Sequence, residues 1–264
     1  MRIAISGTGS QGKSTLISDF LNQWPNYKRE SETYRSLIKE GNFPHSKNTT
    51  KDSQWRILNY MIDEMQKWSK TDKIIMDRCP IDNLVYSLWS FEKQTTDIDK
   101  EFIDKCIPLV RESLRQLDII FFIPITKAAP VMIDDNGIRE TDEFFIKEID
   151  NIFKMLGAQY MQNFDRNPFF PKGDSPGWIE IFGDRQTRIA MIKNYLDVDG
   201  DLIGGTEESL ADLINPYDNK SFDENIQQMK DIIADQKNQR DKDIAIAHQR
   251  QLIKQFNDLA NSRK

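Results

Sequence analysis

Hydrophobic and polar residues follow two alternating patterns along residues 1–196. Short apolar runs occur at 2–6, 73–77, 118–125 and 178–182, each bounded by polar residues or glycine. Between these runs, apolar residues recur every three or four positions, which is typical of one face of a helix. Short runs that alternate with helical stretches predict βαβ units and a parallel sheet. The run at 118–125 is too continuous for a half-exposed strand, so we expect a central strand covered on both faces.

The helical spacing predicts several helices between and after these strands. We expect them at 14–24, 54–68, 81–91, 100–117, 141–164 and 185–196. Pro25 ends the first of these helices, because proline lacks the backbone donor that a helix interior requires.

The character of the chain changes after residue 196. We interpret 1–196 as one α/β domain, 197–221 as a connector rich in Asp, Gly and Asn, and 222–264 as a helical tail. Apolar residues flank the polar stretch 234–243 of the tail, and such residues do not stay exposed on a solitary helix. We therefore expect the tail to pack on the domain or to pair with another copy as a homodimer.

Composition excludes several classes of protein. Hydrophobic residues make up 38% of the chain, and 15 Phe and 5 Trp argue for a folded core. The net charge of −6 opposes broad contact with DNA. Two cysteines and two histidines make a disulfide framework or a four-ligand zinc site improbable. No apolar run is long enough to span a membrane and no signal peptide is evident, so we expect a cytoplasmic protein, in the host cytoplasm if a phage encodes it.

A phosphate-binding motif follows the first predicted strand. The motif G-x-x-x-x-G-K-[ST] covers Gly7, Thr8, Gly9, Ser10, Gln11, Gly12, Lys13 and Ser14. Its fixed positions are occupied by Gly7, Gly12, Lys13 and Ser14, and all four match. The glycines let consecutive N–H groups face a phosphate, and the next helix adds its positive N-terminal end. We expect this loop and Thr15 to bind ATP, with Lys13 reaching the β- and γ-phosphates and Ser14 holding Mg²⁺. The alternative is a glycine-rich turn that binds no nucleotide.

A carboxylate ends the strand at 73–77. Asp77 is expected to bind Mg²⁺ or to accept a proton, because residues at the carboxyl ends of parallel strands face the ligand crevice. Arg78 is expected to contact the transferred phosphoryl group, and Asp82 to lie on the acceptor side. The alternatives are a strand-end turn that pairs Asp77 with Arg78, and a helix cap formed by Asp82. Asp118 precedes its strand and is read as a turn residue.

Four segments together resemble a known family. They are ISGTGSQGKST, MDRCPIDNLVYSLW, DDNGIRETDEFF and IEIFGDRQTRI, in that order within 1–196. They resemble the NadR-type AAA family of small P-loop kinases, which is nicotinamide-riboside- or NMN-kinase-like and often encoded by phages. The resemblance implies a P-loop NTPase fold, with a parallel sheet sandwiched by helices. It supports Asp77 and Arg78 in the roles given above.

The same resemblance implies further site residues. Arg139 corresponds to the arginine of a mobile lid, Glu32 and Arg35 to an acid and an arginine that face the acceptor, and Arg185 to an arginine near adenine. Each has a structural alternative. Arg139 is then a solvated loop residue, Glu32 and Arg35 form a surface ion pair, and Arg185 merely begins a helix. Tyr34 and Trp55 are expected either to stack on a base or to pack in the core.

These features favour a kinase that moves the γ-phosphoryl group of MgATP to a nucleoside or nucleotide. A P-loop ATPase, or a nucleotide-gated binding or assembly module, is the alternative. A hydroxymethylated base in DNA is a second possible acceptor, since residues 28–56 carry a local charge of +3 from seven basic and four acidic side chains.

Overall fold

The computed structural model describes residues 1–30, 34–41, 43–126, 141–162 and 167–203. The predicted tail and most of the predicted connector lie outside these residues, as do Glu32 and Arg139. The expected homodimer contact through the tail therefore also lies outside them. None of the described helices is both long and apolar enough to cross a membrane.

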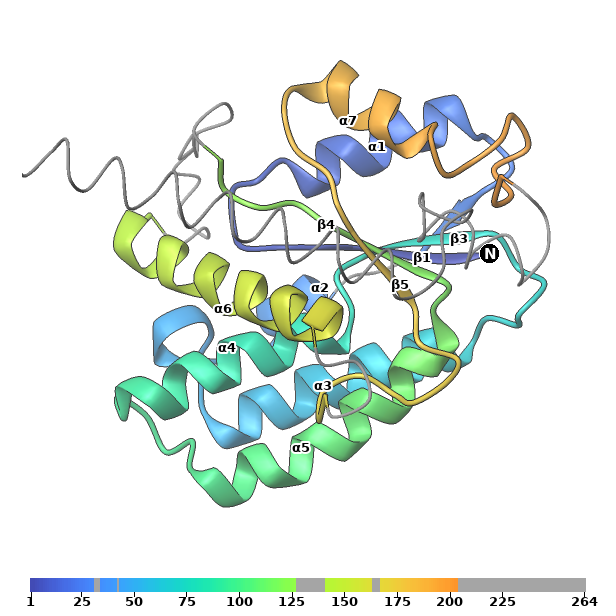
Figure 1. Ribbon diagram of the computed structural model, residues 1–264. Helices are drawn as coiled ribbons and strands as arrows, with labels where there is room; N and C mark the ends of the chain where they lie inside the picture. The colour runs from blue at the N-terminus through green and yellow to red at the C-terminus, as the bar shows by residue number, and fades with distance from the viewer. Residues whose placement is uncertain (31–33, 42, 127–140, 163–166, 204–264) are drawn as a thin grey trace, which may run out of the picture. The chain divides into compact units, whose positions relative to one another are not determined.

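A five-stranded parallel sheet forms the centre of the fold (Figure 1). Its strand order is β2-β3-β1-β4-β5. Its strands are β1 (Arg2–Ser6), β2 (Lys28–Arg29), β3 (Ile74–Asp77), β4 (Ile119–Phe122) and β5 (Gly177–Glu180). The predicted parallel sheet is confirmed. The strand β2 was not predicted, because its two residues are both charged and exposed and so leave no apolar run.

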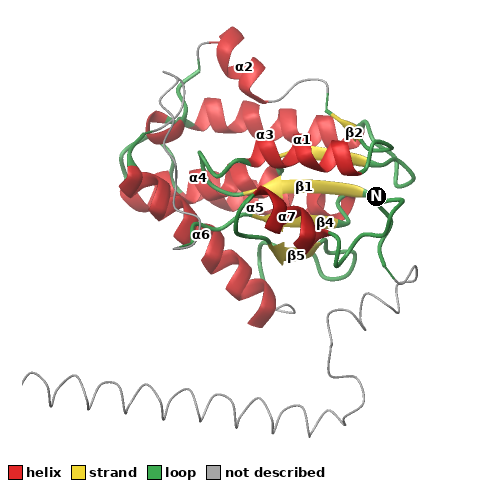
Figure 2. Cartoon of the chain, turned by 90° about the horizontal axis from the view of Figure 1, so that it is seen from above, coloured by secondary structure: helices red, strands yellow, loops and turns green. Residues whose placement is uncertain are grey.

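Helices cover both faces of the sheet (Figures 1 and 2). The helices of one face are α1 (Lys13–Gln23) and α7 (Arg185–Ile192), and those of the other are α3 (Lys51–Gln66), α4 (Pro80–Lys93), α5 (Lys100–Ser113) and α6 (Glu143–Gln162). Successive strand residues point to opposite faces. In β4, Phe121 accordingly packs with α1 and α7, and Phe122 packs with the opposite layer. The predicted central strand is thus covered on both sides.

Short elements complete this arrangement near the carboxyl ends of the strands. They are the helix α2 (Tyr34–Gly41) and the 3-10 turn η1 (Ser46–Asn48), while a second turn, η2 (Leu114–Gln116), follows α5. The helix predicted from residue 54 begins earlier, at Lys51, because Thr50 and Ser53 form a capping box. In that box the Thr50 N–H donates to Ser53 Oγ at 2.8 Å.

The compact unit that contains the sheet runs from Met1 to Ile203. Residues just beyond the predicted boundary at 196 pack on it. The indole of Trp24 donates to the Asp197 carbonyl at 2.7 Å, and the Tyr27 hydroxyl donates to the Gly200 carbonyl at 2.6 Å. The first residues expected in a connector therefore belong to this unit.

Candidate active site

The phosphate loop connects β1 to α1 at the carboxyl end of the sheet. At Gly7, where φ is +136°, a Cβ atom would come within 2.8 Å of the Ile123 carbonyl oxygen, so only glycine fits. Gly12 adopts the left-handed conformation at the N-cap of α1 and supplies no side-chain cap. The first N–H groups of α1 are therefore not capped by a side chain and suit an anion.

The Lys13 ammonium lies inside this loop. It is buried, and its Nζ donates to the Gly7 carbonyl at 2.8 Å and also to the Thr8 carbonyl. These carbonyls hold the positive charge within the curl of the loop. A cation in this place favours the binding of phosphate.

Ser14 and Asp77 come together from two different elements. The Ser14 hydroxyl, in the first turn of α1, donates to Asp77 Oδ2 at 3.0 Å, and Asp77 ends β3. A hydroxyl and a carboxylate are oxygen donors of the kind that Mg²⁺ accepts, and Mg²⁺ commonly completes its shell with phosphate and water. The described residues contain no group of three or more His, Cys, Asp and Glu side chains arranged for a metal. The pair fits a Mg²⁺ ion that is held together with a nucleotide.

Glu30 is a second carboxylate beside Asp77 that the sequence pattern did not predict. Its Oε1 accepts a hydrogen bond from the Asp77 backbone N–H at 2.9 Å, and its side chain is only 7% exposed. Burial raises the pKa of Glu30 to about 7, and the negative charge of Asp77 also raises it. The hydrogen bond from the Asp77 N–H lowers this pKa but does not offset the effect of burial. Glu30 follows β2, so the only signal in the sequence was an acid after a very short charged strand.

Asp82 joins Arg78 to the phosphate loop. Arg78 Nη1 donates to the Gly7 carbonyl at 3.0 Å and to Asp82 Oδ1 at 2.9 Å, and both side chains are buried. The other oxygen, Asp82 Oδ2, accepts from the Ser6 hydroxyl at 2.6 Å and from the Cys79 N–H at 3.1 Å. The last contact is the helix cap considered above, but the same carboxylate also holds Arg78.

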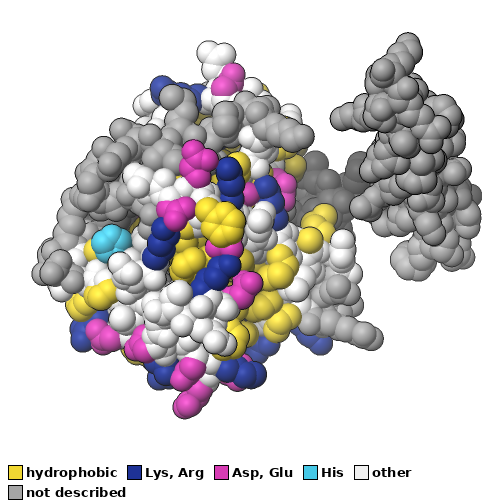
Figure 3. All heavy atoms as spheres, turned by 90° about the vertical axis from the view of Figure 1, so that its left-hand side faces the viewer, with side chains coloured by type: hydrophobic (Ala, Val, Ile, Leu, Met, Phe, Trp, Pro, Cys, Tyr) yellow, Lys and Arg dark blue, Asp and Glu magenta, His cyan; other side chains and the backbone are white. Residues whose placement is uncertain are grey.

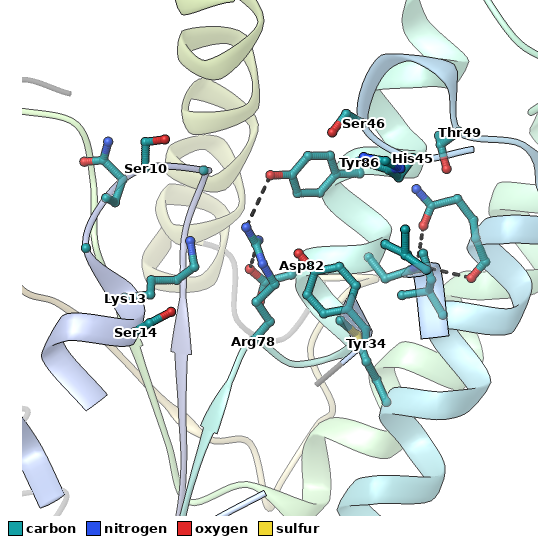
Figure 4. A pocket seen from close by; sticks show the side chains of 18 of the residues that line it. Ser10, Lys13, Ser14, Tyr34, His45, Ser46, Thr49, Arg78, Asp82 and Tyr86 are labelled. Atoms are coloured by element: carbon teal, nitrogen blue, oxygen red, sulfur yellow. Dashed lines mark hydrogen bonds and ion pairs between the residues drawn. The ribbon is translucent and has the colours of Figure 1, made fainter. Parts of the chain in front are cut away.

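A cavity of about 360 Å³ extends from the phosphate loop to a second wall. Figure 4 shows Ser10, Lys13 and Ser14 on one side and Tyr34, His45, Ser46 and Thr49 across from them, with Arg78, Asp82 and Tyr86 between. The Arg78 guanidinium lies 5.8 Å from the ring centre of Tyr34 and 5.4 Å from that of Tyr86. The cavity thus has an anion-binding end and an end with aromatic rings.

A buried pair of amides lines the second wall. The Asn83 amide nitrogen donates to the Gln54 backbone carbonyl at 3.1 Å and to the Gln54 side-chain oxygen. These two acceptors fix the orientation of the Asn83 amide, and its Oδ1 has no hydrogen-bond partner within the described residues. Ile57 and Met61 of α3 complete this part of the wall. The wall therefore offers a polar edge beside apolar side chains.

Comparison with known proteins identifies the family. The sequence profile of a family of AAA domains matches residues 2–162. The chain belongs to this AAA-domain family. The membership agrees with the NadR-type AAA resemblance and confirms it. None of the curated protein sequences that were compared matches the chain.

Solved structures share the fold of this AAA domain. Deoxyadenosine kinase from M. mycoides with the products dCMP and dCDP is 16% identical, with a TM-score of 0.55, and the match covers 74% of this chain and 97% of that chain. The same kinase with bound dATP is 18% identical over the same shares, with a TM-score of 0.50. The NadR protein in complex with NR is 18% identical, with a TM-score of 0.46, over 82% of this chain and 51% of that chain. The two deoxyadenosine kinase matches show that the AAA domain has the fold of P-loop kinases, as predicted.

Two arginines of α7 differ in their relation to the phosphate loop of this AAA domain. Arg185, predicted to lie near adenine, forms two hydrogen bonds with Asp19 of α1, at 2.6 and 2.9 Å, and its side chain is 71% exposed. Arg185 does not line the cavity. Arg188, one turn later, donates from Nη1 to the Gln11 carbonyl at 2.7 Å. The arginine that reaches the loop is therefore Arg188.

The other residues predicted from the sequence differ in whether they lie at the cavity. Tyr34 lines the cavity, as a residue that stacks on a base would, whereas Arg35 lies in α2 and its side chain is outside the described part. Asp118 accepts a hydrogen bond from the Arg2 backbone N–H at 2.6 Å, at the opposite end of the sheet from the site. It is a turn residue, as expected.

Proposed function

We propose that this AAA domain is an ATP-dependent phosphotransferase that moves the γ-phosphoryl group of MgATP to the hydroxyl of a nucleoside or nucleotide. The observation that carries the proposal is the continuity of the cavity. It runs from the phosphate loop to a wall of aromatic and amide side chains. A site for ATP hydrolysis needs only the first of these ends, whereas transfer to an acceptor needs both.

The donor end has the groups that phosphoryl transfer requires. Lys13 and the N–H groups of α1 bind the phosphates, and Ser14 with Asp77 binds Mg²⁺. When bound, Mg²⁺ neutralises charge on the phosphate oxygens. Arg78 lies between the two ends and stabilises the charge that spreads over the transferred group.

The acceptor end suits a nucleobase. The edge of a nucleobase presents neighbouring hydrogen-bond donors and acceptors. Asn83 Oδ1 is a buried acceptor, and the Gln54 amide nitrogen donates to no described residue, so the pair matches such an edge. Tyr34 and Tyr86 provide aromatic surface for the ring.

The acceptor hydroxyl must lose a proton. We assign this proton to Glu30, because its buried carboxylate accepts a hydrogen bond from the Asp77 backbone at 2.9 Å, and burial raises its pKa toward the working pH that suits a general base. In this assignment Asp77 binds Mg²⁺. Arg139 as the lid arginine, and Glu32 and Arg35 on the acceptor side, remain part of the proposal on the basis of the family resemblance. We also propose that the acceptor is a small molecule and not a hydroxymethylated base in DNA.

The test is a transfer assay with γ-labelled ATP and a panel of nucleosides, deoxynucleosides, their monophosphates and nicotinamide riboside. Label in one of these acceptors, absent with Lys13→Ala, supports the proposal. Label released only as inorganic phosphate would instead indicate an ATPase.

A second arm of the assay uses single-stranded DNA that contains hydroxymethylated bases. On the face drawn in Figure 3, Lys and Arg side chains of the described residues alternate with Asp and Glu and form no broad basic surface. We therefore expect no label in this DNA. If only this DNA were labelled, the protein would still be a kinase, but its acceptor would be a base in DNA and not a small molecule.

A further inference from the structure

Arg188 holds the phosphate loop from outside. It lies in α7, and its Nη1 donates to the carbonyl oxygen of Gln11 at 2.7 Å. A Cβ atom on Gly12, the next residue of the loop, would lie 3.4 Å from the same nitrogen. The guanidinium therefore packs on the Gln11–Gly12 peptide, immediately before Lys13.

The geometry of a peptide bond gives this contact a consequence inside the loop. In a trans peptide the C=O of one residue and the N–H of the next point in opposite directions. Holding the Gln11 carbonyl toward α7 therefore turns the Gly12 N–H away from α7. In a loop that binds phosphate through its backbone, the N–H groups must point at the anion before it arrives.

The surroundings of Arg188 favour a role toward an anion over a role in an ion pair. Asp184 attracts Arg188 electrostatically, but the described residues hold no salt bridge to Arg188, and its buried Nε has no hydrogen-bond partner among them. Arg185 is the opposite case, since its charge is paired with Asp19. The charge of Arg188 adds positive potential next to the loop.

We propose that Arg188 is a positioning residue for the triphosphate of ATP. It orients the Gly12 N–H through the Gln11 carbonyl and adds charge beside the loop, so it raises affinity for the polyphosphate and not for the acceptor. The inference rests on the proposed function, because that function makes ATP the ligand of the loop.

The experiment compares Arg188→Ala, Arg188→Gln and the matched control Arg185→Ala in the full chain. Calorimetry measures Kd for ATP and for inorganic tripolyphosphate, and a transfer assay measures KM for the acceptor. We expect Arg188→Ala to raise both Kd values by about tenfold, the effect of losing a hydrogen bond from a charged donor. Arg188→Gln keeps a donor and should recover part of the affinity. Arg185→Ala should bind tripolyphosphate as the wild type does, because this ligand has no adenine for Arg185 to contact. KM for the acceptor should stay within twofold in all variants.

Several outcomes overturn the inference. One is a Kd for ATP within twofold of wild type in Arg188→Ala, and another is an equal loss of affinity for tripolyphosphate in Arg185→Ala. If Arg188→Ala does not fold, Arg188→Gln and Arg188→Lys carry the test, and wild-type affinity in both rejects the role. If the wild type binds ATP and transfers phosphate, and the Arg188 variants bind ATP as tightly as the wild type does, this inference is refuted but the proposed function is not. A wild-type protein that binds neither ATP nor tripolyphosphate refutes the proposed function as well.

Discussion

The Ser14 hydroxyl donates a hydrogen bond to the Asp77 carboxylate at 3.0 Å, across 63 positions of the chain. The contact joins the first turn of α1 to the end of β3. It follows from the strand order, because β1 and β3 are neighbours and their carboxyl ends lie at the same edge of the sheet. Two residues that the sequence suggested separately for Mg²⁺ are thus in direct contact.

Asp77→Asn should fold and bind ATP but turn over at least 100-fold more slowly. The amide keeps the size and the hydrogen-bond acceptor of the carboxylate, but it loses the charge that binds Mg²⁺. Steady-state kinetics across a Mg²⁺ titration, with ATP affinity measured separately, check this. Turnover within about threefold of wild type would show that Asp77 is only a turn residue and that the essential acid lies elsewhere.

Lys13→Ala should lower the rate of phosphoryl transfer by on the order of 10² or more, since it removes a fixed charge from the transferred phosphate. The fold should persist, because the ammonium donates to the Gly7 and Thr8 carbonyls, which belong to the same loop as Lys13. Circular dichroism and thermal melting check the fold, and the transfer assay checks the rate. Lys100→Ala, an exposed change on α5, is the control. Wild-type activity in folded Lys13→Ala protein would reject the loop as the ATP site.

Glu30→Gln should change how stability depends on pH. In the folded chain the pKa of Glu30 is raised from 4.5 to about 7, so between these values the folded state binds the proton more tightly than the unfolded state does. The contribution of Glu30 to stability therefore falls as pH rises from about 4.5 to 7, by at most about 3 kcal/mol. Glutamine has no such proton and removes this fall.

Urea unfolding at pH 5 and pH 8 measures the effect of Glu30→Gln. We expect the variant to gain stability relative to wild type at pH 8 and little at pH 5. The exposed Glu112→Gln is the control, because its side chain is 73% exposed. An unchanged pH dependence in Glu30→Gln would contradict the raised pKa. Its transfer rate should also fall sharply near neutral pH if Glu30 accepts the hydroxyl proton.

Asp82→Ala should lower the free energy of unfolding by about 3 kcal/mol or more, because it leaves the buried Arg78 charge without its partner. Asp104→Ala is the matched control. It also breaks an i,i+4 pair, with Lys100, but that pair is exposed, and the loss should be below about 0.5 kcal/mol. Chemical denaturation of both variants measures the difference. Equal, small losses would mean that Asp82 is no more than a helix cap.

The sequence by itself determined the parts of this protein that depend on local pattern. Glycine spacing identified the phosphate loop, because a backbone that curls around a phosphate needs residues without a Cβ atom at fixed intervals. The continuous apolar run before Pro124 indicated a buried strand, and β4 is fully buried between β1 and β5. Asp77 was identified because an acid that directly follows a buried strand of a parallel sheet lies at the ligand edge.

Only the tertiary structure decided which residues from separate elements meet. Glu30 lies beside Asp77 because the two-residue strand β2 pairs with β3, and such a short charged strand has no hydrophobic pattern to reveal it. Gln54 and Asn83 face each other across α3 and α4, a contact fixed by helix packing. Arg185 and Arg188 are both arginines of one short helix, and nothing in the local sequence separates them. The rotation of α7 against the phosphate loop turns Arg185 to Asp19 and Arg188 to the Gln11 carbonyl, because residues three apart on a helix project about 60° from each other.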